Sequence, residues 1–326
     1  MVTYKGINGF AVQSVATDPS PLDEGQVWYN NATYAFKLAS VTTAGAWASG
    51  GNLNTGRSEI VGTGTQTAAL AATGQPVASS GNKSESYNGT SWTNTPNLNT
   101  ARAEGAAAGT QTATIVFAGR TPSVSDATES WNGSSWTSLP ANMNTARHGL
   151  AGCGTQTAAL GFGGYIPPVT AATELWNGTS WTSNPTGLGT ARYRLAGFGT
   201  QTAAVAVGGT VIPGSVRQTA TELWNGSTWT SNPTGLNTAR NGLGGAGIQT
   251  AGLVFGGNIS PPTGATESWN GTIWTSSPTG LATARAYLAG CGSQTSALAF
   301  GGLPTTAATE EWTGPGAPVT KTITTS

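Results

Sequence analysis

One short pattern recurs along most of the chain, and its spacing limits the folds that the chain can adopt. Arginine follows Thr-Ala or Thr-Gly six times, at intervals of 45, 45, 45, 48 and 45 residues. The six arginines are Arg57, Arg102, Arg147, Arg192, Arg240 and Arg285. A segment that returns at a fixed interval is normally one supersecondary unit that cannot bury its apolar face alone and packs against its own copies. The chain is therefore expected to fold as a closed or stacked array of such units.

Each unit has further fixed points. A glutamine follows the arginine by nine residues, and a pair of small residues, usually Gly-Gly, ends 17 residues after the arginine. A glutamate comes next, after a gap of 8 to 13 residues, and a tryptophan follows the first five glutamates by seven residues. The six glutamates are Glu85, Glu129, Glu174, Glu222, Glu267 and Glu310. Each unit therefore has one variable connection in an otherwise constant frame.

The residue patterns within a unit indicate strands. Short apolar runs such as "AAVAVGG" alternate with polar turns, and no helical period is present. The Asn-Gly pair between "ATELWN" and "SWTS" predicts a type I′ hairpin, because both residues accept the positive φ angles of that turn. Four short strands in each unit are typical of a propeller blade. The 12 tryptophans, at roughly 150–250 Å² each, are expected to pack between blades in a chain otherwise rich in Gly, Ala and Thr. The sequence thus predicts an all-β protein.

The order of these motifs resembles kelch repeats. An arginine-led first strand, an apolar second strand ending in Gly-Gly, a Glu-x-aromatic third strand and a tryptophan in the fourth follow the kelch order over roughly residues 45–314. The unit is shorter than the roughly 50 residues usual for kelch, and its Asn-Gly turn differs from that of many kelch blades. The resemblance implies a six-bladed, kelch-like β-propeller.

The two ends of the repeat array complement each other. The last unit reaches "TEEW" but lacks a fourth-strand tryptophan, whereas Trp47 lies ten residues before Arg57, in the fourth-strand place. We expect this N-terminal strand to complete the last blade and remove a free sheet edge. Seven blades are the alternative, with the extra hairpin in "GQVWYNNATYAFKL". The expected domains are an N-terminal attachment segment with a β-hairpin (1–44), the propeller (45–314) and a C-terminal tail (315–326).

A second resemblance concerns the N-terminal segment. The stretch "EGQVWYNNATYAFKL", after "TDPSPLDE", is similar to a short hairpin element of tail and other virion structural proteins of bacteriophages. It implies a virion protein that is assembled in the host cytoplasm, in several copies per particle. Its partners would be other virion proteins and a host-surface glycan or receptor. No signal-peptide pattern and no apolar run of about 18 residues is present, so membrane insertion is not expected.

The charges are few and balanced. Thirteen Lys and Arg residues face 13 Asp and Glu residues, which gives no electrostatic reason for a nucleic-acid partner. The six repeated arginines and six repeated glutamates are predicted to form a structural network of ion pairs that fixes neighbouring strands or blades. The alternative is a sugar site between blades, because six-bladed fucose-binding lectins resemble this chain in using Arg, Glu and Trp there.

The residues that could support catalysis are sparse. His148 is the only histidine, so neither a multi-histidine metal site nor a conventional Ser-His-Asp triad is expected. The carboxylates outside the repeat show no paired acid and base in the sequence; they are Asp18, Asp23, Asp126, Glu24, Glu59, Glu104 and Glu311. Cys153 and Cys291 occupy the same place in units three apart and are predicted to be free thiols. We expect no enzyme activity, cofactor or metal.

The variable connections are where specificity can differ between units. The candidate binding-rim residues on these connections are Arg120, Tyr165, Ile166, Arg217 and Ile259. The leading hypothesis is a non-enzymatic virion component, in a tail, fibre or decoration, whose propeller binds protein or the host surface. The alternatives are a carbohydrate-binding propeller lectin and an intracellular kelch adaptor.

Overall fold

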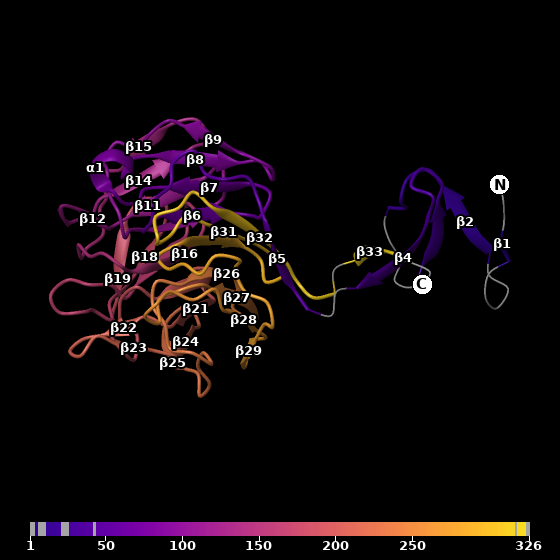
Figure 1. The fold of residues 1–326 in the computed structure, drawn as a ribbon. Coiled ribbons are helices and arrows are strands. Elements are labelled where there is room, and N and C mark those ends of the chain that lie inside the picture. The colour runs from indigo at the N-terminus through magenta and orange to yellow at the C-terminus, as the bar shows by residue number, and fades with distance from the viewer. Residues whose placement is uncertain (1–3, 6–10, 21–25, 42–43, 317, 324–326) are drawn as a thin grey trace. The chain divides into compact units, whose positions relative to one another are not determined.

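The protein consists of two units (Figure 1). The computed structural model describes residues 4–5, 11–20, 26–41, 44–316 and 318–323. The smaller unit combines residues Met1–Ala46 with Thr313–Ser326, and the larger unit is Trp47–Trp312. The predicted limits of the repeat domain, 45 and 314, lie within two residues of these boundaries. The separately predicted tail 315–326 instead groups with the N-terminal segment, because strand β33 (Pro318–Thr322) pairs with β4 (Ala35–Val41).

The larger unit is a repeat of four-stranded antiparallel sheets, six within the residues described. The first sheet contains β6 (Val61–Gly64), β7 (Ala69–Ala72), β8 (Ser84–Tyr87) and β9 (Trp92–Thr95). The second contains β10 (Ala106–Gly109), β11 (Thr114–Phe117), β14 (Thr128–Trp131) and β15 (Trp136–Ser138). The third contains β16 (Ala151–Gly154), β17 (Ala159–Phe162), β18 (Thr173–Trp176) and β19 (Trp181–Asn184).

The remaining three sheets repeat the design. The fourth contains β20 (Ala196–Gly199), β21 (Ala204–Val207), β24 (Thr221–Trp224) and β25 (Trp229–Ser231). The fifth contains β26 (Gly244–Ile248), β27 (Ala251–Phe255), β28 (Thr266–Trp269) and β29 (Trp274–Ser276). The sixth contains β30 (Ala289–Gly292), β31 (Ser296–Phe300), β32 (Thr309–Thr313) and, from the other end of the array, β5 (Ala46–Ser49). The variable connections add the short helix α1 (Val77–Ser80) and the two-stranded pairs β12 (Arg120–Thr121) with β13 (Ser123–Val124) and β22 (Thr210–Val211) with β23 (Val216–Arg217).

Burial across each sheet follows the residue types of its strands. The first strands alternate buried and half-buried positions, and the second strands are buried almost throughout, which is why they read as continuous apolar runs. The fourth strands place a tryptophan inward and expose the Thr, Ser and Asn residues that follow it. The core therefore lies along the inner strands and between neighbouring sheets.

The sequence predicts a two-residue Asn-Gly hairpin loop, whereas the loop in the structure is longer. Tyr87 pairs with Trp92, so four residues connect β8 and β9 instead of two. Gly89 has a φ of +92°, and the side-chain oxygen of Asn88 accepts hydrogen bonds from the backbone N–H groups of Thr90 and Ser91. This Asx turn holds Asn88 itself outside the positive-φ region. The type I′ prediction is therefore wrong, although the hairpin is present.

The sheets follow one another in a cycle. The first strand of each sheet contacts that of the next, and β30 of the sixth sheet contacts β6 of the first. The backbone N–H of Gly50, just after β5, donates to the carbonyl oxygen of Thr309 in β32 over 2.9 Å. The strand that contains Trp47 thus completes the sixth sheet, as its matching to the repeat predicts. Repeated antiparallel sheets in this cyclic order make a β-propeller-like repeat.

Aromatic side chains fill the spaces between sheets. Trp181 of the third sheet lies 4.7 Å from Phe117 of the second, measured between ring centroids, and its indole N–H donates to Thr128 Oγ1. Trp229 of the fourth sheet repeats both contacts with Phe162 and Thr173 of the third. The tryptophans are therefore packing residues at the sheet interfaces, as their recurrence predicts.

The smaller unit is one five-stranded sheet in the order β1 (Tyr4–Lys5), β2 (Ala11–Val15), β3 (Val27–Asn30), β4 and β33. The predicted hairpin in "GQVWYNNATYAFKL" is present as β3 and β4, and it belongs to this sheet and not to a four-stranded repeat sheet. Trp28 is fully buried, and its indole N–H donates to Asp18 over 2.9 Å. No helix among the described residues is long and apolar enough to cross a membrane.

Candidate functional site

The repeated arginines and glutamates form buried ion pairs within each sheet. Each arginine precedes the first strand and reaches the glutamate of the third strand, and all six arginine side chains are 0% exposed. The pairs are Arg57–Glu85 (2.5 Å), Arg102–Glu129, Arg147–Glu174 (3.2 Å), Arg192–Glu222 (3.0 Å), Arg240–Glu267 (2.9 Å) and Arg285–Glu310 (3.1 Å). Burial lowers the pKa of each arginine and the partner glutamate opposes this shift. These residues offer no surface to a sugar.

The ion-pair segment also links neighbouring sheets through its backbone. The carbonyl oxygen of Arg102 accepts a hydrogen bond from the N–H of Gly74, in the double glycine of the preceding sheet, over 3.0 Å. The carbonyl oxygen of Arg57 accepts the equivalent bond from Gly302 of the sixth sheet over 2.9 Å. The repeated arginine therefore joins its own third strand to the previous unit, which is a structural role.

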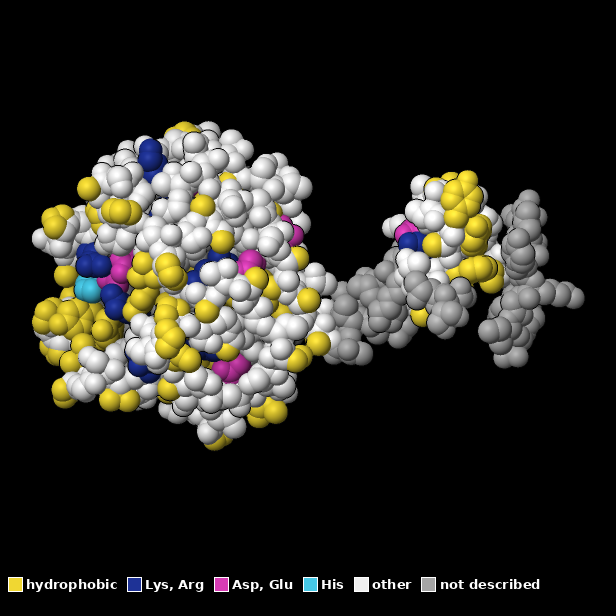
Figure 2. Space-filling view, in the orientation of Figure 1, with side chains coloured by type: hydrophobic (Ala, Val, Ile, Leu, Met, Phe, Trp, Pro, Cys, Tyr) yellow, Lys and Arg dark blue, Asp and Glu magenta, His cyan; other side chains and the backbone are white. Residues whose placement is uncertain are grey.

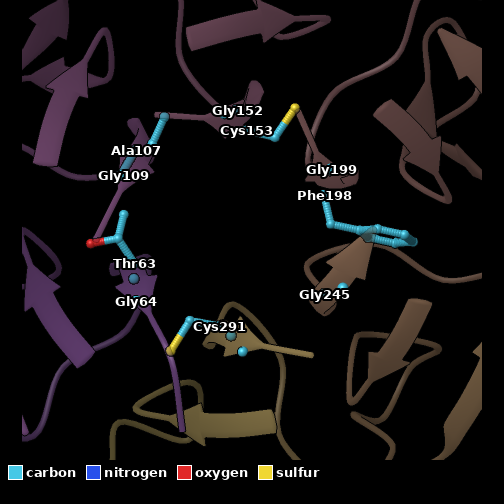
Figure 3. Close-up of a pocket in the computed structure, with 17 residues that line it drawn as sticks. Thr63, Gly64, Ala107, Gly109, Gly152, Cys153, Phe198, Gly199, Gly245 and Cys291 are labelled. Atoms are coloured by element: carbon cyan, nitrogen blue, oxygen red, sulfur yellow. The ribbon is translucent and has the colours of Figure 1, made fainter. Parts of the chain in front are cut away.

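An axial channel runs between the first strands. Three hollows follow one another along this channel, and neighbouring hollows share lining residues. The first and the middle hollow are both lined by the small residues Gly62, Ala107, Gly152, Gly197, Gly245 and Gly290. Figure 3 shows the first hollow at the end where the glutamine turns lie, with Cys153 and Cys291 on opposite sides. Both thiols are free and buried, and burial raises the pKa of each to about 12. The prediction of two separate free cysteines is confirmed.

The opposite end of the channel is closed by a ring of backbone hydrogen bonds. The residue two positions after each repeated arginine donates its N–H to the carbonyl oxygen of the equivalent residue in the preceding unit, over 2.6–3.2 Å. We call these six residues the axial ring: Glu59, Glu104, Gly149, Arg194, Gly242 and Tyr287. All six have positive φ, between 53° and 63°. Four of them carry side chains in this conformation, which costs on the order of 1–3 kcal/mol each. These four residues are therefore candidates for a functional role.

The side chains of the axial ring form a charged cluster. Glu104 accepts hydrogen bonds from Arg194 Nε at 2.8 Å and contacts His148 Nδ1 at 2.5 Å and Arg120 Nε at 3.0 Å. Arg120 also reaches Glu59 through Nη2 at 2.9 Å. Burial alone would raise the pKa of Glu104, but the His148 hydrogen bond and the charge of Arg194 outweigh it and lower this pKa to about 2. Glu104 is therefore ionised and held by three partners.

Aromatic side chains surround this cluster. The guanidinium of Arg194 lies 4.7 Å from the ring centroid of Tyr287 and 5.4 Å from that of Tyr193. Tyr193 in turn packs on Tyr165 at 5.5 Å, and Tyr165 packs edge-on against His148 at 5.4 Å. These four rings and one guanidinium make a continuous, half-buried row beside the axis.

Glycine makes room for this row at one position of the axial ring. A Cβ atom on Gly242 would lie 2.6 Å from the ring of Tyr287. Any larger residue there would push Tyr287 away from Arg194. The absence of a side chain at Gly242 is thus part of the site, as well as a means of adopting a φ of +58°.

The axial ring lines a pocket of about 100 Å³, which we call the axial pocket. Figure 2 shows a histidine, basic and acidic side chains together on one face of the larger unit, next to a patch of hydrophobic side chains. The variable connections lie at the same end, because their first residues bridge the residues that follow the repeated arginines, as in Ala103 with Arg120 and His148 with Tyr165.

The structure brings together only part of the predicted binding rim. Arg120 and Tyr165 contact the cluster. Arg217 instead donates from Nη2 to Ser260 Oγ over 2.6 Å, Ile259 is 38% exposed and Ile166 is half-buried on its connection. The rim is therefore divided into residues that belong to the axial pocket and residues that lie on the outer connections.

Sequence reasoning missed the centre of the site. Glu59 and Glu104 were expected to be unrelated carboxylates, but Arg120 bridges them. Glu104 is ionised and is held by Arg194, Arg120 and His148. The available signal was the position two residues after each repeated arginine, where residue type changes from unit to unit while the flanking pattern stays constant.

No set of His, Cys, Asp and Glu residues in the described part of the chain could hold a metal ion. The site therefore has to be understood from its ion pairs and aromatic rings. No protein-family model matches the chain, and no curated protein matches it significantly.

Proposed function

We propose that the larger unit is a six-bladed, kelch-like β-propeller and that it is the non-enzymatic binding part of a phage virion structural protein. The face with the axial pocket and the variable connections would contact a host-surface molecule or another protein. The smaller unit would attach the propeller to the particle. Several copies on one particle would strengthen weak contacts through a high effective concentration.

One observation carries the assignment of binding to this face. The two ends of the channel are built from equivalent positions of six units, but they differ in chemistry. The first hollow is lined at one such position by Thr63, Ala108, Cys153, Phe198 and Cys291, none of them charged, whereas the axial ring at the other end carries Glu, Glu, Gly, Arg, Gly and Tyr. Carboxylate, guanidinium and phenol groups gathered at equivalent positions with positive φ support recognition of an asymmetric, polar partner.

The chemistry of the pocket favours binding over catalysis. The Glu104 carboxylate is held by Arg194 at 2.5 Å and Arg120 at 3.0 Å, and its pKa of about 2 makes it poorly suited to accepting a proton at neutral pH. The strained backbone and the ion pairs fix the side chains before a ligand arrives, which reduces the entropy lost on binding.

The attachment role of the smaller unit rests on the phage resemblance and on topology. The strands from both ends of the chain lie in one sheet, so that the propeller sequence is inserted between β4 and β33. Such an arrangement gives the smaller unit two covalent connections to the propeller.

The test begins with mass spectrometry of purified virions from the phage that encodes this chain. Detection of the chain at a fixed stoichiometry supports the proposal, and its absence from particles contradicts it. Particles carrying Arg120→Ala should then adsorb more slowly to host cells than particles carrying Thr179→Ala, a matched change at the other end of the third sheet. A propeller that binds glycans although the chain is absent from particles would favour the lectin, and co-purification with one cellular protein would favour the adaptor.

A further inference from the structure

We propose that the axial pocket binds a single ring of a neutral saccharide. This inference rests on the proposed function, because it assigns a ligand class to the face proposed to bind the partner. Four features of the pocket lead to it: its charge balance, its aromatic faces, its donors and its shape.

The charges of the pocket cancel. Glu59 and Glu104 carry two formal negative charges, and Arg120 and Arg194 carry two positive charges within hydrogen-bond distance of them. An anionic ligand would have to compete with Glu104 for arginine N–H groups that are already engaged. A cationic ligand would compete with the same arginines for the carboxylates. An uncharged polar ligand avoids both costs.

The tyrosines provide flat surfaces for an apolar face. Tyr287 lines the pocket, and Tyr193 and Tyr165 lie next to it along the aromatic row; all three are half-buried, and each carries an aromatic ring with a hydroxyl group at its edge. A sugar ring has the complementary construction, with C–H groups on its faces and hydroxyl groups around its rim. Stacking on a tyrosine removes apolar surface from water and leaves the hydroxyls free to form hydrogen bonds.

Hydrogen-bond donors remain for the hydroxyls of such a ligand. The hydroxyl oxygen of Tyr287 accepts bonds from Arg194 Nη1 at 3.2 Å and Asn258 Nδ2 at 3.5 Å. Both contacts use this oxygen as the acceptor, so its proton can be donated to a ligand. The side chains of Arg120 and Arg194 are 36% and 26% exposed, which keeps part of each guanidinium within reach.

The shape of the site favours a compact ring over an extended peptide. Six units surround the axial pocket on all sides, and its volume is about 100 Å³. An extended peptide needs an open groove or a free strand edge, whereas a pocket on an axis, surrounded by six units, accepts one terminal ring. The six-residue axial ring is fixed by its own backbone bonds, so the pocket is formed before the ligand binds.

Saturation-transfer NMR on the full chain tests the inference, with the methyl glycosides of glucose, galactose, mannose and N-acetylglucosamine as probes. We expect at least one of them to bind, and Tyr287→Ala to weaken that binding by about tenfold or more. Tyr287→Phe keeps the ring but removes the hydroxyl donor, and should lose less. Tyr34→Ala, which removes a tyrosine that is 81% exposed in the smaller unit, is the matched control and should bind as the unmodified protein does. Thermal melting checks that each variant is folded.

The inference is overturned if none of the four glycosides binds, or if Tyr287→Ala and Tyr287→Phe both leave binding unchanged. Sialic acid and an acidic decapeptide are included as charged probes. Binding of either of them in place of the neutral sugars would overturn the ligand class while supporting a binding role for this face. Absence of the chain from virions would instead contradict the proposed function and leave a measured sugar affinity intact, so the two failures can be told apart.

Discussion

Gln66 donates a hydrogen bond from its side-chain amide to the carbonyl oxygen of Trp312 over 2.7 Å, although 246 positions separate the two residues. The equivalent bond joins each of the remaining pairs of neighbouring sheets, as in Gln201 with Trp176 at 2.6 Å. The first and last sheets are thus joined by the contact that joins all their neighbours. This equivalence makes the closure of the array open to a direct measurement.

Gln66→Ala should destabilise the protein at least as much as Gln201→Ala does. Each change removes two side-chain hydrogen bonds to backbone carbonyl oxygens of the preceding sheet, at a cost of about 1–3 kcal/mol in the free energy of unfolding. Gln66→Ala also removes the acceptor of the Ser296 hydroxyl, at 2.7 Å. Urea unfolding followed by tryptophan fluorescence measures both. An effect near zero for Gln66→Ala, beside a clear loss for Gln201→Ala, would show that the first and last sheets are not joined.

Ser84→Thr should stabilise the protein by up to about 1 kcal/mol. At the start of the third strands, threonine hydroxyls accept the indole N–H of a tryptophan in the next sheet, as in Thr173 with Trp229 at 2.9 Å. Serine occupies this place in the first sheet, and within the described structure neither Ser84 Oγ nor Trp136 Nε1 has a hydrogen-bond partner. A threonine there should restore the repeated bond.

The matched reverse change is Thr173→Ser, which should destabilise by a similar amount. Both variants can be compared by their urea midpoints at constant m-value. A loss of stability in Ser84→Thr would mean that the added methyl group is too large for the buried site, which is 2% exposed.

Glu222→Leu should cost about 3–5 kcal/mol, because it leaves the Arg192 charge buried without a partner. The double variant Arg192→Met with Glu222→Leu should be more stable than Glu222→Leu alone, since no isolated charge then remains. Chemical unfolding of the single and double variants measures the difference. Arg217→Met, at a half-buried arginine outside the repeated pairs, is the control and should change stability by about 1 kcal/mol or less. A double variant no more stable than Glu222→Leu would contradict this account of the network.

Acid should destabilise the protein partly through Glu104. Its folded-state pKa of about 2 lies below the ordinary glutamate pKa of about 4.5, so its contribution is fully present above pH 4.5 and is lost as the pH falls towards 2. Glu104→Gln should therefore flatten the fall in unfolding free energy across this window. Urea titrations at several pH values between 2 and 5 measure the slope, with Tyr34→Ala as the control for substitution itself. Equal slopes with and without Glu104 would refute the assignment.

The sequence predicts the fold well because each repeated unit carries the same pattern of residues. Constant offsets from the repeated arginine identify the strands, and the position of Trp47 relative to Arg57 identifies the strand that completes the sixth sheet. Local chemistry was less reliable. At Asn88 the side chain bonds the turn backbone, so a dipeptide typical of a type I′ turn produces a different hairpin.

The candidate site could be predicted only in part because it depends on closure. Arg120 and Tyr165 were found from the variability of their connections. Glu104 and Arg194 meet across 90 positions, and nothing near either residue in the sequence refers to the other. Their contact follows only when equivalent positions of six units are placed around one axis. The pairing of β33 with β4 was also not expected, because it too joins parts of the chain that lie far apart in the sequence.

That last pairing has a consequence for biosynthesis. β4 is made before any of the six sheets of the larger unit, and its neighbour β33 is made after all of them. A ribosome must therefore translate the complete ring before the small sheet can gain its final strand. A chain that stalls or is cut within the repeats would leave that sheet unfinished, so that only fully synthesised molecules carry the complete five-stranded sheet.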